Sequence, residues 1–399
     1  SYRVTRDEQH VTRGRANTLR MAMSGQLDEG KSAISDAALQ TANDSLDLCV
    51  ACKGCKRDCP TGVDMAKVKI EFAQLYKQRF GFTLKDKLIA ALPDYARVAS
   101  RFAPLLNLRN RIPLLATLSE RLLGFSAKRS LPEWQSTHFF NSNNHALQTA
   151  TKAEVLAAVK PVVLFVDTFN GYFESDNAFA AVKVLQAAGY TVHVAAKQGG
   201  SHTSGAGHLC CGRTYLSSGM VEKAAAKMAE LLTELAPFAQ KGISIVGLEP
   251  SCLLTLRDEA LVMFKQMPMD SGLQAIAQVV STKAVLFEEF LAAEAKAGRM
   301  DALRTALDKA SSANGAGAGG VGLVTTADTL GATRVGGDRR SRRCVPGAGD
   351  AGGELRASRR APARPPVHRA GPQQVHLVRA VRRRVRRDRG AGRPGLPVG

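Results

Sequence analysis

The sequence predicts a multidomain α+β protein, in which a helical lobe precedes an α/β domain with a parallel sheet. Three observations support this fold class. Four cysteines lie close together between two helical patterns, short apolar runs alternate with helical patterns after about residue 159, and the composition changes abruptly after residue 309. A chain of 399 residues is long enough for two or three domains with their own cores. We expect domains at 1–81, 82–158, 159–309 and 310–399.

Residues 1–81 are expected to form helices around the cysteines. Helical patterns cover about residues 12–27 and 35–48. Residues 61–64 read Thr-Gly-Val-Asp, which matches a capping box at the start of a helix. Apolar side chains then recur at helical spacing and are expected to pack this lobe: Met65, Val68, Phe72 and Leu75. Residues 82–135 continue as a helical connector with four interruptions: Pro93, Pro104, Pro113 and Pro132.

The α/β domain is predicted from strands that alternate with helices. Apolar runs at 161–167, 190–196 and 243–248 suit buried parallel strands. Helical patterns lie between and after them, at about 175–188, 218–241, 254–267 and 284–296. This alternation indicates βαβ units and a parallel sheet. A further strand-like run covers residues 321–326, without a partner strand that the sequence identifies.

The cysteine quartet consists of Cys49, Cys52, Cys55 and Cys59, and Pro60 follows at once. The spacing C-x2-C-x2-C-x3-C-P is that of the bacterial ferredoxin motif, which holds an iron–sulfur cluster. A structural zinc site usually takes its ligands from two separated pairs, which one compact quartet does not offer. We therefore expect a helical ferredoxin-like lobe with a [4Fe–4S] cluster; structural zinc and inert thiols are the alternatives.

A second group of cysteines follows the predicted strands. Cys210 and Cys211 precede Gly212, and Cys252 ends the run Glu-Pro-Ser-Cys at 249–252. Both segments are expected at the carboxyl edge of the parallel sheet, where binding sites usually lie. A helix that begins after Cys252 would lower the pKa of its thiol. This group is a second candidate metal site, and the alternative is a set of small buried residues. Two histidines precede the pair, and loop histidines usually have no such role: His202 and His208.

The net charge of +20 comes mainly from the end of the chain. Residues 310–399 hold 18 arginines, no lysine, five acids and no aromatic side chain. Three interpretations are open: an arginine-rich arm that binds nucleic acid, a disordered tail that cannot bury a core, or out-of-frame translation of a GC-rich gene. Such a segment is a poor guide to function, and we assign none from it.

The cysteine usage indicates a reducing compartment. Eight cysteines gather in a few motifs, which is typical of metal chemistry rather than of a disulfide framework. No secretory signal opens the sequence, and no apolar run is long enough to span a bilayer. We expect a cytoplasmic protein. Peripheral association with the inner face of the membrane is compatible with that location.

These motifs together resemble the iron–sulfur half of FAD-linked 2-hydroxyacid dehydrogenases, the glycolate oxidase and D-lactate dehydrogenase group. The resemblance covers about residues 1–300 and rests on five segments: 1–5, 12–17, 49–65, 210–213 and 249–252. It implies a cysteine-rich CCG domain after the iron–sulfur lobe. The sequence is also similar to the CCG-bearing subunits of heterodisulfide reductase and anaerobic glycerol-3-phosphate dehydrogenase.

The sequence departs from these families in three respects. The dehydrogenases place another cysteine motif before the segment that matches residues 1–5, so we expect the chain to begin after that motif. In two-cluster ferredoxins the fourth cysteine ligates the other cluster, so either Cys59 completes one cubane or a three-thiolate centre remains. CCG domains have an upstream cysteine where Asp167-Thr168-Phe169 stands and a later C-x-x-C, of which only Cys252 is present; a second CCG repeat, expected beyond residue 310, has no match.

The resemblance implies the iron–sulfur electron-transfer portion of an oxidoreductase that oxidises a small 2-hydroxy acid. FAD would lie on an upstream domain, since the chain has no FAD fingerprint. Expected partners are an FAD-binding oxidase domain or subunit and an electron acceptor (a quinone, a cytochrome or a ferredoxin-like protein), with no nucleic acid. Two alternatives stay open: a subunit of the heterodisulfide reductase or glycerol-3-phosphate dehydrogenase type and, from another class, a zinc-stabilised basic binding module.

Overall fold

The computed structural model describes residues 2–28, 34–141, 149–197, 208–266 and 271–313. Over these residues the protein is mostly helical, with one sheet of four strands. The helices before the first strand are α1 Tyr2–Thr5, η1 Glu8–His10, α2 Thr12–Ser24, η2 Gln26–Asp28, α3 Asp36–Asp47, α4 Gly54–Asp58, α5 Met65–Phe80, α6 Leu84–Ala90, α7 Leu92–Arg101, α8 Ala103–Arg111, α9 Pro113–Leu123 and α10 Lys152–Ala157.

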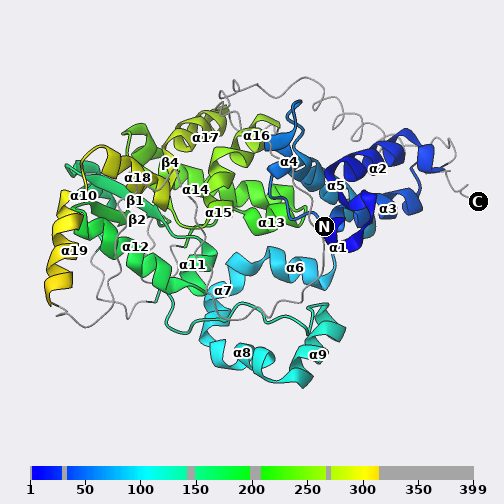
Figure 1. Ribbon diagram of the computed structural model, residues 1–399, viewed down its shortest axis with the longest axis horizontal. Helices are drawn as coiled ribbons and strands as arrows, with labels where there is room; N and C mark the ends of the chain where they lie inside the picture. The colour runs from blue at the N-terminus through cyan, green and yellow to red at the C-terminus, as the bar shows by residue number, and fades with distance from the viewer. Residues whose placement is uncertain (1, 29–33, 142–148, 198–207, 267–270, 314–399) are drawn as a thin grey trace, which may run out of the picture.

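The sheet and its helices occupy the second half of the described chain. In chain order the elements are β1 Pro161–Phe165, α11 Thr168–Tyr172, α12 Ser175–Ala187, β2 Thr191–Val194, α13 Arg213–Ser217, α14 Val221–Gln240, β3 Ile245–Gly247, α15 Pro250–Arg257, α16 Glu259–Gln266, α17 Ser271–Lys283, β4 Ala284–Leu286, α18 Phe287–Lys296 and α19 Asp301–Ala313. Figure 1 shows α1 to α5 at one end of the molecule and the sheet at the other, with α8 and α9 extending away from both.

All strand pairs of the sheet are parallel, and the strand order is β2-β1-β3-β4. The register pairs Val162 with Val192 and Leu164 with Val246. The three strands predicted from the apolar runs are confirmed as β1, β2 and β3. The prediction of βαβ units and a parallel sheet is therefore confirmed.

The central strand β1 contributes to two cores, one on each face of the sheet. Val163 and Phe165 pack with the side chains of α14, α15 and α17. Val162, Leu164 and Val166 pack with those of α11 and α12. Because successive side chains of a strand point to opposite faces, one short run of apolar residues fills both cores. All of these side chains but Val166 are no more than 1% exposed, as expected for a parallel strand covered on both faces.

A third core lies among α2, α3 and α5. Met65 and Phe72 are buried in it, and Val68 packs against it, so the predicted apolar face of α5 is confirmed in these three members. The capping box predicted at residues 61–64 is wrong, because Thr61 is not the N-cap of α5. Asp64 itself is the N-cap of α5, because its Oδ1 accepts hydrogen bonds from the backbone N–H groups of the next turn.

Several helix ends differ from the prediction. The helix predicted at 254–267 starts at Pro250, because Glu249 caps the turn and proline suits the first helical position. It also ends at Arg257, and α16 begins two residues later. The helix predicted at 218–241 begins at Val221, after the separate helix α13. The helix predicted from residue 284 opens instead with β4, which pairs with β3, since a three-residue apolar run cannot be distinguished from helix by its pattern.

The connector is helical as far as Leu123, but residues 124–141, which include Pro132, form no helix, although the sequence predicts a helical pattern to about residue 135. Pro93, Pro104 and Pro113 each lie in the first turn of a helix, which their missing N–H groups allow. Trp134 packs against Phe173, with ring centroids 4.3 Å apart, so its role is packing. The strand-like run at 321–326 lies outside the described residues, as does the tail beyond Ala313, where α19 ends.

Candidate functional site

The cysteine quartet lies on the segment between α3 and α5. Ala51 and Lys53 have φ angles of 53° and 59°, in the left-handed region that residues with a Cβ seldom adopt. Left-handed residues that alternate with ordinary ones turn successive backbone N–H groups toward one side, an arrangement that forms anion sites in many iron–sulfur proteins. Such conformations cost about 1–3 kcal/mol each and cluster at functional sites. Two left-handed residues with side chains thus lie within three positions of the quartet segment.

The four thiols of the quartet differ in exposure. Cys52 is exposed, whereas Cys49, Cys55 and Cys59 are partly buried. Cys55 packs against the core of α2, α3 and α5. Within the described part of the chain, no group of three or more His, Cys, Asp and Glu side chains is placed to hold a metal ion. The quartet thus fits an iron–sulfur cluster in ligand type and spacing, while its sulfur atoms do not converge on one point.

Local contacts fix both ends of the quartet segment. At the first end, Lys69 Nζ donates to the backbone oxygens of Cys49 and Leu46, at 2.6 and 3.0 Å. At the other end, the sulfur of Cys59 lies 3.1 Å from Thr61 Oγ1. The hydrogen bond from Thr61 and those from nearby backbone N–H groups lower the pKa of Cys59. The thiolate, which is the form that ligates metals, is therefore favoured at this position.

The second cysteine group gathers at the carboxyl edge of the sheet. Cys210 and Cys211 precede α13, on the segment that returns from β2, and Cys252 lies in the first turn of α15, directly after β3. Cys210 and Cys211, and likewise Cys211 and Cys252, lie close enough to shift the pKa of one another's thiols, and all three thiols are buried. The structure thus brings together the two segments that the sequence assigned to this edge. His202 lies outside the described residues.

These three thiols are held in their neutral form. The hydrogen bond with Cys211, together with burial, raises the pKa of Cys210 well above the usual value. The contact with Cys210 lowers the pKa of Cys211. The contact with Cys252 and burial raise it by more, so the pKa of Cys211 also lies well above the usual value. The hydrogen bond with Cys211 lowers the pKa of Cys252, yet burial and nearby negative groups, Asp167 among them, leave it raised. The expectation that a helix N-terminus lowers the pKa of Cys252 is therefore wrong.

Gly212 allows the cysteine pair to lie directly on α14. Its φ is 75°, and an added Cβ would lie 2.6 Å from the backbone oxygen of Ala224. No side chain fits at that distance, so glycine is required by both the space and the conformation. The backbone N–H of Gly212 also donates to the sulfur of Cys210 at 3.3 Å.

Asp167 lies in the segment that the resemblance to CCG domains aligns with their upstream cysteine. It is 2% exposed and caps α11, since its Oδ1 accepts from the backbone N–H of Phe169 at 2.8 Å and of Asn170 at 3.2 Å. Its Oδ2 accepts from the side-chain amide of Asn170 at 2.7 Å. Burial raises the pKa of Asp167 despite these hydrogen bonds. Both carboxylate oxygens are therefore engaged in the helix cap, next to the thiols.

A polar pocket of about 190 Å³ opens beside Cys210. His208 lines it, and its Nε2 lies 3.3 Å from Thr168 Oγ1. Burial and the nearby lysines lower the pKa of His208 to about 3, so the imidazole is neutral at physiological pH. The remaining lining residues come mostly from the connector and α14, and no sequence signal connects them to the cysteines: Pro93, Asp94, Arg97, Tyr172, Lys197, Lys227 and Glu230.

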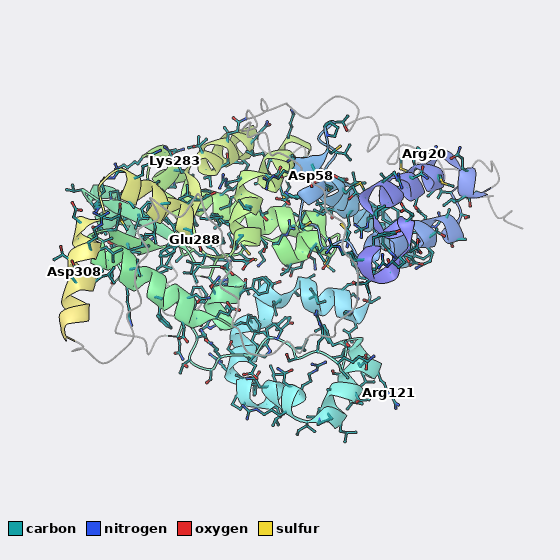
Figure 2. All side chains as sticks on the ribbon, viewed as in Figure 1. Arg20, Asp58, Arg121, Lys283, Glu288 and Asp308 are labelled. Atoms are coloured by element: carbon teal, nitrogen blue, oxygen red, sulfur yellow. The ribbon has the colours of Figure 1, made fainter. Side chains whose placement is uncertain are left out.

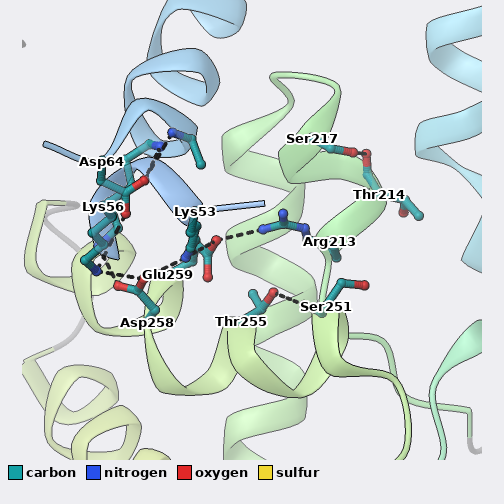
Figure 3. Close-up of polar contacts among 12 residues, drawn as sticks. Lys53, Lys56, Asp64, Arg213, Thr214, Ser217, Ser251, Thr255, Asp258 and Glu259 are labelled. Atoms are coloured by element: carbon teal, nitrogen blue, oxygen red, sulfur yellow. Dashed lines mark hydrogen bonds and ion pairs between the residues drawn. The ribbon is translucent and has the colours of Figure 1, made fainter. Parts of the chain in front are cut away.

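An ion-pair network connects the two cysteine groups (Figure 3). Lys53, between two quartet cysteines, contacts Asp258 Oδ2 at 2.6 Å and Glu259 Oε1 at 2.8 Å. Arg213, two residues after Cys211, binds the same Glu259 oxygen at 2.7 Å. Two more lysines bind Asp258: Lys56 at 3.1 Å and Lys67 at 2.6 Å.

The two carboxylates of this network lie where α15, the helix of Cys252, gives way to α16. Burial would raise the pKa of Asp258, but hydrogen bonds from Lys53 and Lys67 hold it far below the usual value. Glu259 is only 6% exposed. The network therefore fixes the quartet segment against the segments that carry the second cysteine group. The sequence analysis missed it, because its partners are far apart in the chain.

The difference in thiol environment leads to a testable prediction. In metal-free native protein at pH 7.5, iodoacetamide should modify Cys52 and Cys59 at least about tenfold faster than Cys210, Cys211 and Cys252, because Cys52 is exposed and the pKa of Cys59 is lowered, whereas the other three thiols are buried and neutral. Peptide mapping by mass spectrometry measures the rate at each site. Denatured protein is the control, in which all five rates should converge. Equal rates in the native protein would contradict the buried, neutral state of the second group.

Comparison with known proteins places the chain beside dehydrogenases. It is 27% identical over 214 residues to D-2-hydroxyglutarate dehydrogenase of Escherichia coli, and the aligned region covers 53% of this chain and 20% of that protein. The Haemophilus influenzae protein of the same name is 26% identical over 219 residues, or 54% and 20% of the two chains. That of Pseudomonas putida is 25% identical over 297 residues, or 65% and 28%.

No protein-family model matches the chain, and no solved structure does. The alignments span about a fifth of the length of the E. coli and H. influenzae relatives. A dehydrogenase is an oxidoreductase, so the prediction of an oxidoreductase component agrees with these relatives. The chain is similar, at low identity and over about half its length, to one part of proteins named D-2-hydroxyglutarate dehydrogenase.

Proposed function

We propose that this chain is the iron–sulfur electron-transfer portion of an FAD-linked oxidoreductase that oxidises a small 2-hydroxy acid. The observation that carries the proposal is the quartet Cys49, Cys52, Cys55 and Cys59, whose spacing is that of a cluster motif and whose backbone contains two left-handed residues. The name of the relatives supports the reaction class and makes D-2-hydroxyglutarate the first substrate to test with the whole protein.

The quartet cysteines would hold a [4Fe–4S] cluster, which supplies one-electron transfer when it is bound. The chain itself contributes charge and orientation. Lys53, Lys56 and Arg57 lie among the ligands, and positive charge beside an anionic centre favours its reduced state. Asp258 and Glu259 neutralise part of that charge through Lys53 and Lys56. The balance between these lysines and carboxylates is therefore expected to tune the potential of the site.

Cys210, Cys211 and Cys252 form the second candidate metal site. Their raised pKa values mean that a metal must displace thiol protons to bind there, so uptake at this site is expected to rise with pH. Oxidation of a 2-hydroxy acid to the 2-oxo acid releases two electrons and two protons. The electrons would leave through FAD on a partner domain or subunit and pass singly to a quinone, a cytochrome or a ferredoxin-like acceptor. We place this chemistry in the cytoplasm.

The test is the metal content of protein purified without oxygen. We expect about four iron atoms and a similar amount of acid-labile sulfide per chain for one cubane. Reduction by dithionite should give an electron paramagnetic resonance signal, and the protein should be brown. A colourless protein with stoichiometric zinc would instead support the zinc-stabilised binding module and reject the electron-transfer role. A protein with neither metal would reject both.

A further inference from the structure

The helical hairpin of α8 and α9 presents an apolar stripe to solvent. Leu114, Leu118 and Leu122 are 76%, 48% and 68% exposed. Their spacing of four residues places them on one face of α9. On the other arm of the hairpin, Phe102 and Leu105 are 57% and 64% exposed. Figure 1 shows that this hairpin extends away from the sheet and from α1 to α5. Large apolar side chains that are exposed along one helix face are typical of an interaction site.

Residues outside the stripe contribute most of the contacts that hold the hairpin. Ala103 and Ala116 are its buried apolar side chains, Leu108, Leu115 and Leu123 are partly buried, and polar contacts add to them. Arg109 donates to Ser119 Oγ at 3.0 Å and to the backbone oxygens of Ser126 and Arg129, at 2.6 and 2.7 Å. Because these contacts hold the hairpin, the exposed faces of Leu114, Leu118 and Leu122 remain available to contact another surface.

The charge around the stripe is almost entirely positive. Glu120 is the one acid between residues 101 and 131, a range that holds six basic residues. Five of the six are exposed: Arg101, Arg111, Arg121, Lys128 and Arg129. Figure 2 labels Arg121 at the outer end of the hairpin, beyond the other elements. The hairpin is therefore amphipathic and basic.

We propose that the hairpin of α8 and α9 is a docking surface for an anionic lipid bilayer. Helices with leucine and phenylalanine on one side and arginine around them lie in the membrane interface, where apolar side chains enter the acyl boundary and basic ones contact anionic headgroups. The positive rim matches the negative charge of such lipids. No helix among the described residues has the length and apolar character to cross a bilayer, so the contact is peripheral. The proposal does not depend on a bound cluster.

The test is binding of the full chain to vesicles of phosphatidylcholine with phosphatidylglycerol, measured by cosedimentation. The combined variant Leu114→Ser, Leu118→Ser and Leu122→Ser is expected to bind about 100-fold more weakly. The variant Arg111→Gln with Arg121→Gln is expected to bind about 30-fold more weakly, since each basic residue near an anionic surface contributes about fivefold. The arginine-rich tail adds charge of its own, so Arg20→Gln with Lys296→Gln serves as the control of equal charge, with binding nearly unchanged.

A second readout separates insertion from attraction by charge. In Leu118→Trp, tryptophan emission should shift to the blue and be quenched by brominated lipid, also at high salt; Arg20→Trp, on α2, should show neither effect. Circular dichroism checks that each variant is folded. Folded leucine variants that bind like the parent, or an unquenched Leu118→Trp, would overturn the proposal. So would equal binding to pure phosphatidylcholine. Loss of self-association with vesicle binding intact would assign the face to contact between copies.

Discussion

Cys52→Ser is expected to leave anaerobically purified protein with less than about one iron atom per chain, against about four in the parent. Cys52 is the exposed member of the quartet, and a Cβ added at Gly54, in the same loop, would lie 3.7 Å from its sulfur. Serine has nearly the same shape but ligates iron poorly. The loss of iron would therefore reflect a missing ligand and not a disturbed core. Iron and sulfide analysis with Mössbauer spectroscopy measures the result.

The matched control for Cys52→Ser is Val50→Ser. Val50 lies in the same segment and is 83% exposed, so its replacement changes the loop without removing a thiol. Its iron content should equal that of the parent. If both variants lost iron equally, the loop conformation and not the thiol would hold the metal. If Cys52→Ser kept its iron, the quartet would not be the ligand set that we propose.

Glu259→Gln is expected to lower the free energy of unfolding by about 3 kcal/mol, because it removes the carboxylate that Arg213 binds and one of the two that Lys53 binds, at a buried position. Lys53 and Arg213 both bind the Glu259 Oε1 atom, and the side chain is 6% exposed. At about 2.1 cal/mol/K of unfolding entropy per residue, the loss corresponds to a fall of about 4 °C in Tm for a chain of 399 residues. Thermal unfolding followed by circular dichroism, in the metal-free protein, measures it.

The control for Glu259→Gln is Glu289→Gln. Glu289 pairs with Arg257 at 2.7 Å, but its side chain is 47% exposed, so the change should cost less than about 1 kcal/mol. Equal losses for Glu259→Gln and Glu289→Gln would mean that the network contributes nothing beyond a surface pair.

Acid should weaken the same network. Because the pKa of Asp258 is lower in the folded protein than the usual value near 3.8, the stabilisation by Asp258 is fully present above that value and declines as the pH falls below it.

The sheet could be predicted from the sequence because its signals are local. Val162 to Phe165 form one unbroken apolar run, which is what a strand covered on both faces requires. Position 64 shows the limit of such signals. Thr61 and Asp64 satisfy the spacing of a capping box, yet Asp64 caps the helix alone. A motif of small polar residues fits two registers, and only the packing of Met65 and Phe72 in the core of this lobe selects one.

The sequence predicts the part of the candidate site whose position follows from the sheet topology alone. Parallel strands end at one edge, so Cys211 and Cys252 could be expected to meet across 41 positions of sequence. The raised pKa of Cys252 could not be foreseen, since the lowering by Cys211 and the larger effects of burial and Asp167 depend on the folded structure. Lys53 and Asp258 are ordinary charged residues in the sequence, and nothing local distinguishes them from solvated side chains. Their pairing depends on how two folded units meet, which a single sequence does not encode in any motif.

The separation of 205 positions between Lys53 and Asp258 has a consequence during protein synthesis. A ribosome that adds about 5–20 residues per second needs roughly 10–40 s to pass from one to the other. During that interval the nascent quartet segment is already complete, while the carboxylates that later bind its lysines do not yet exist. The quartet cysteines therefore leave the ribosome while the second half of the chain is still being synthesised.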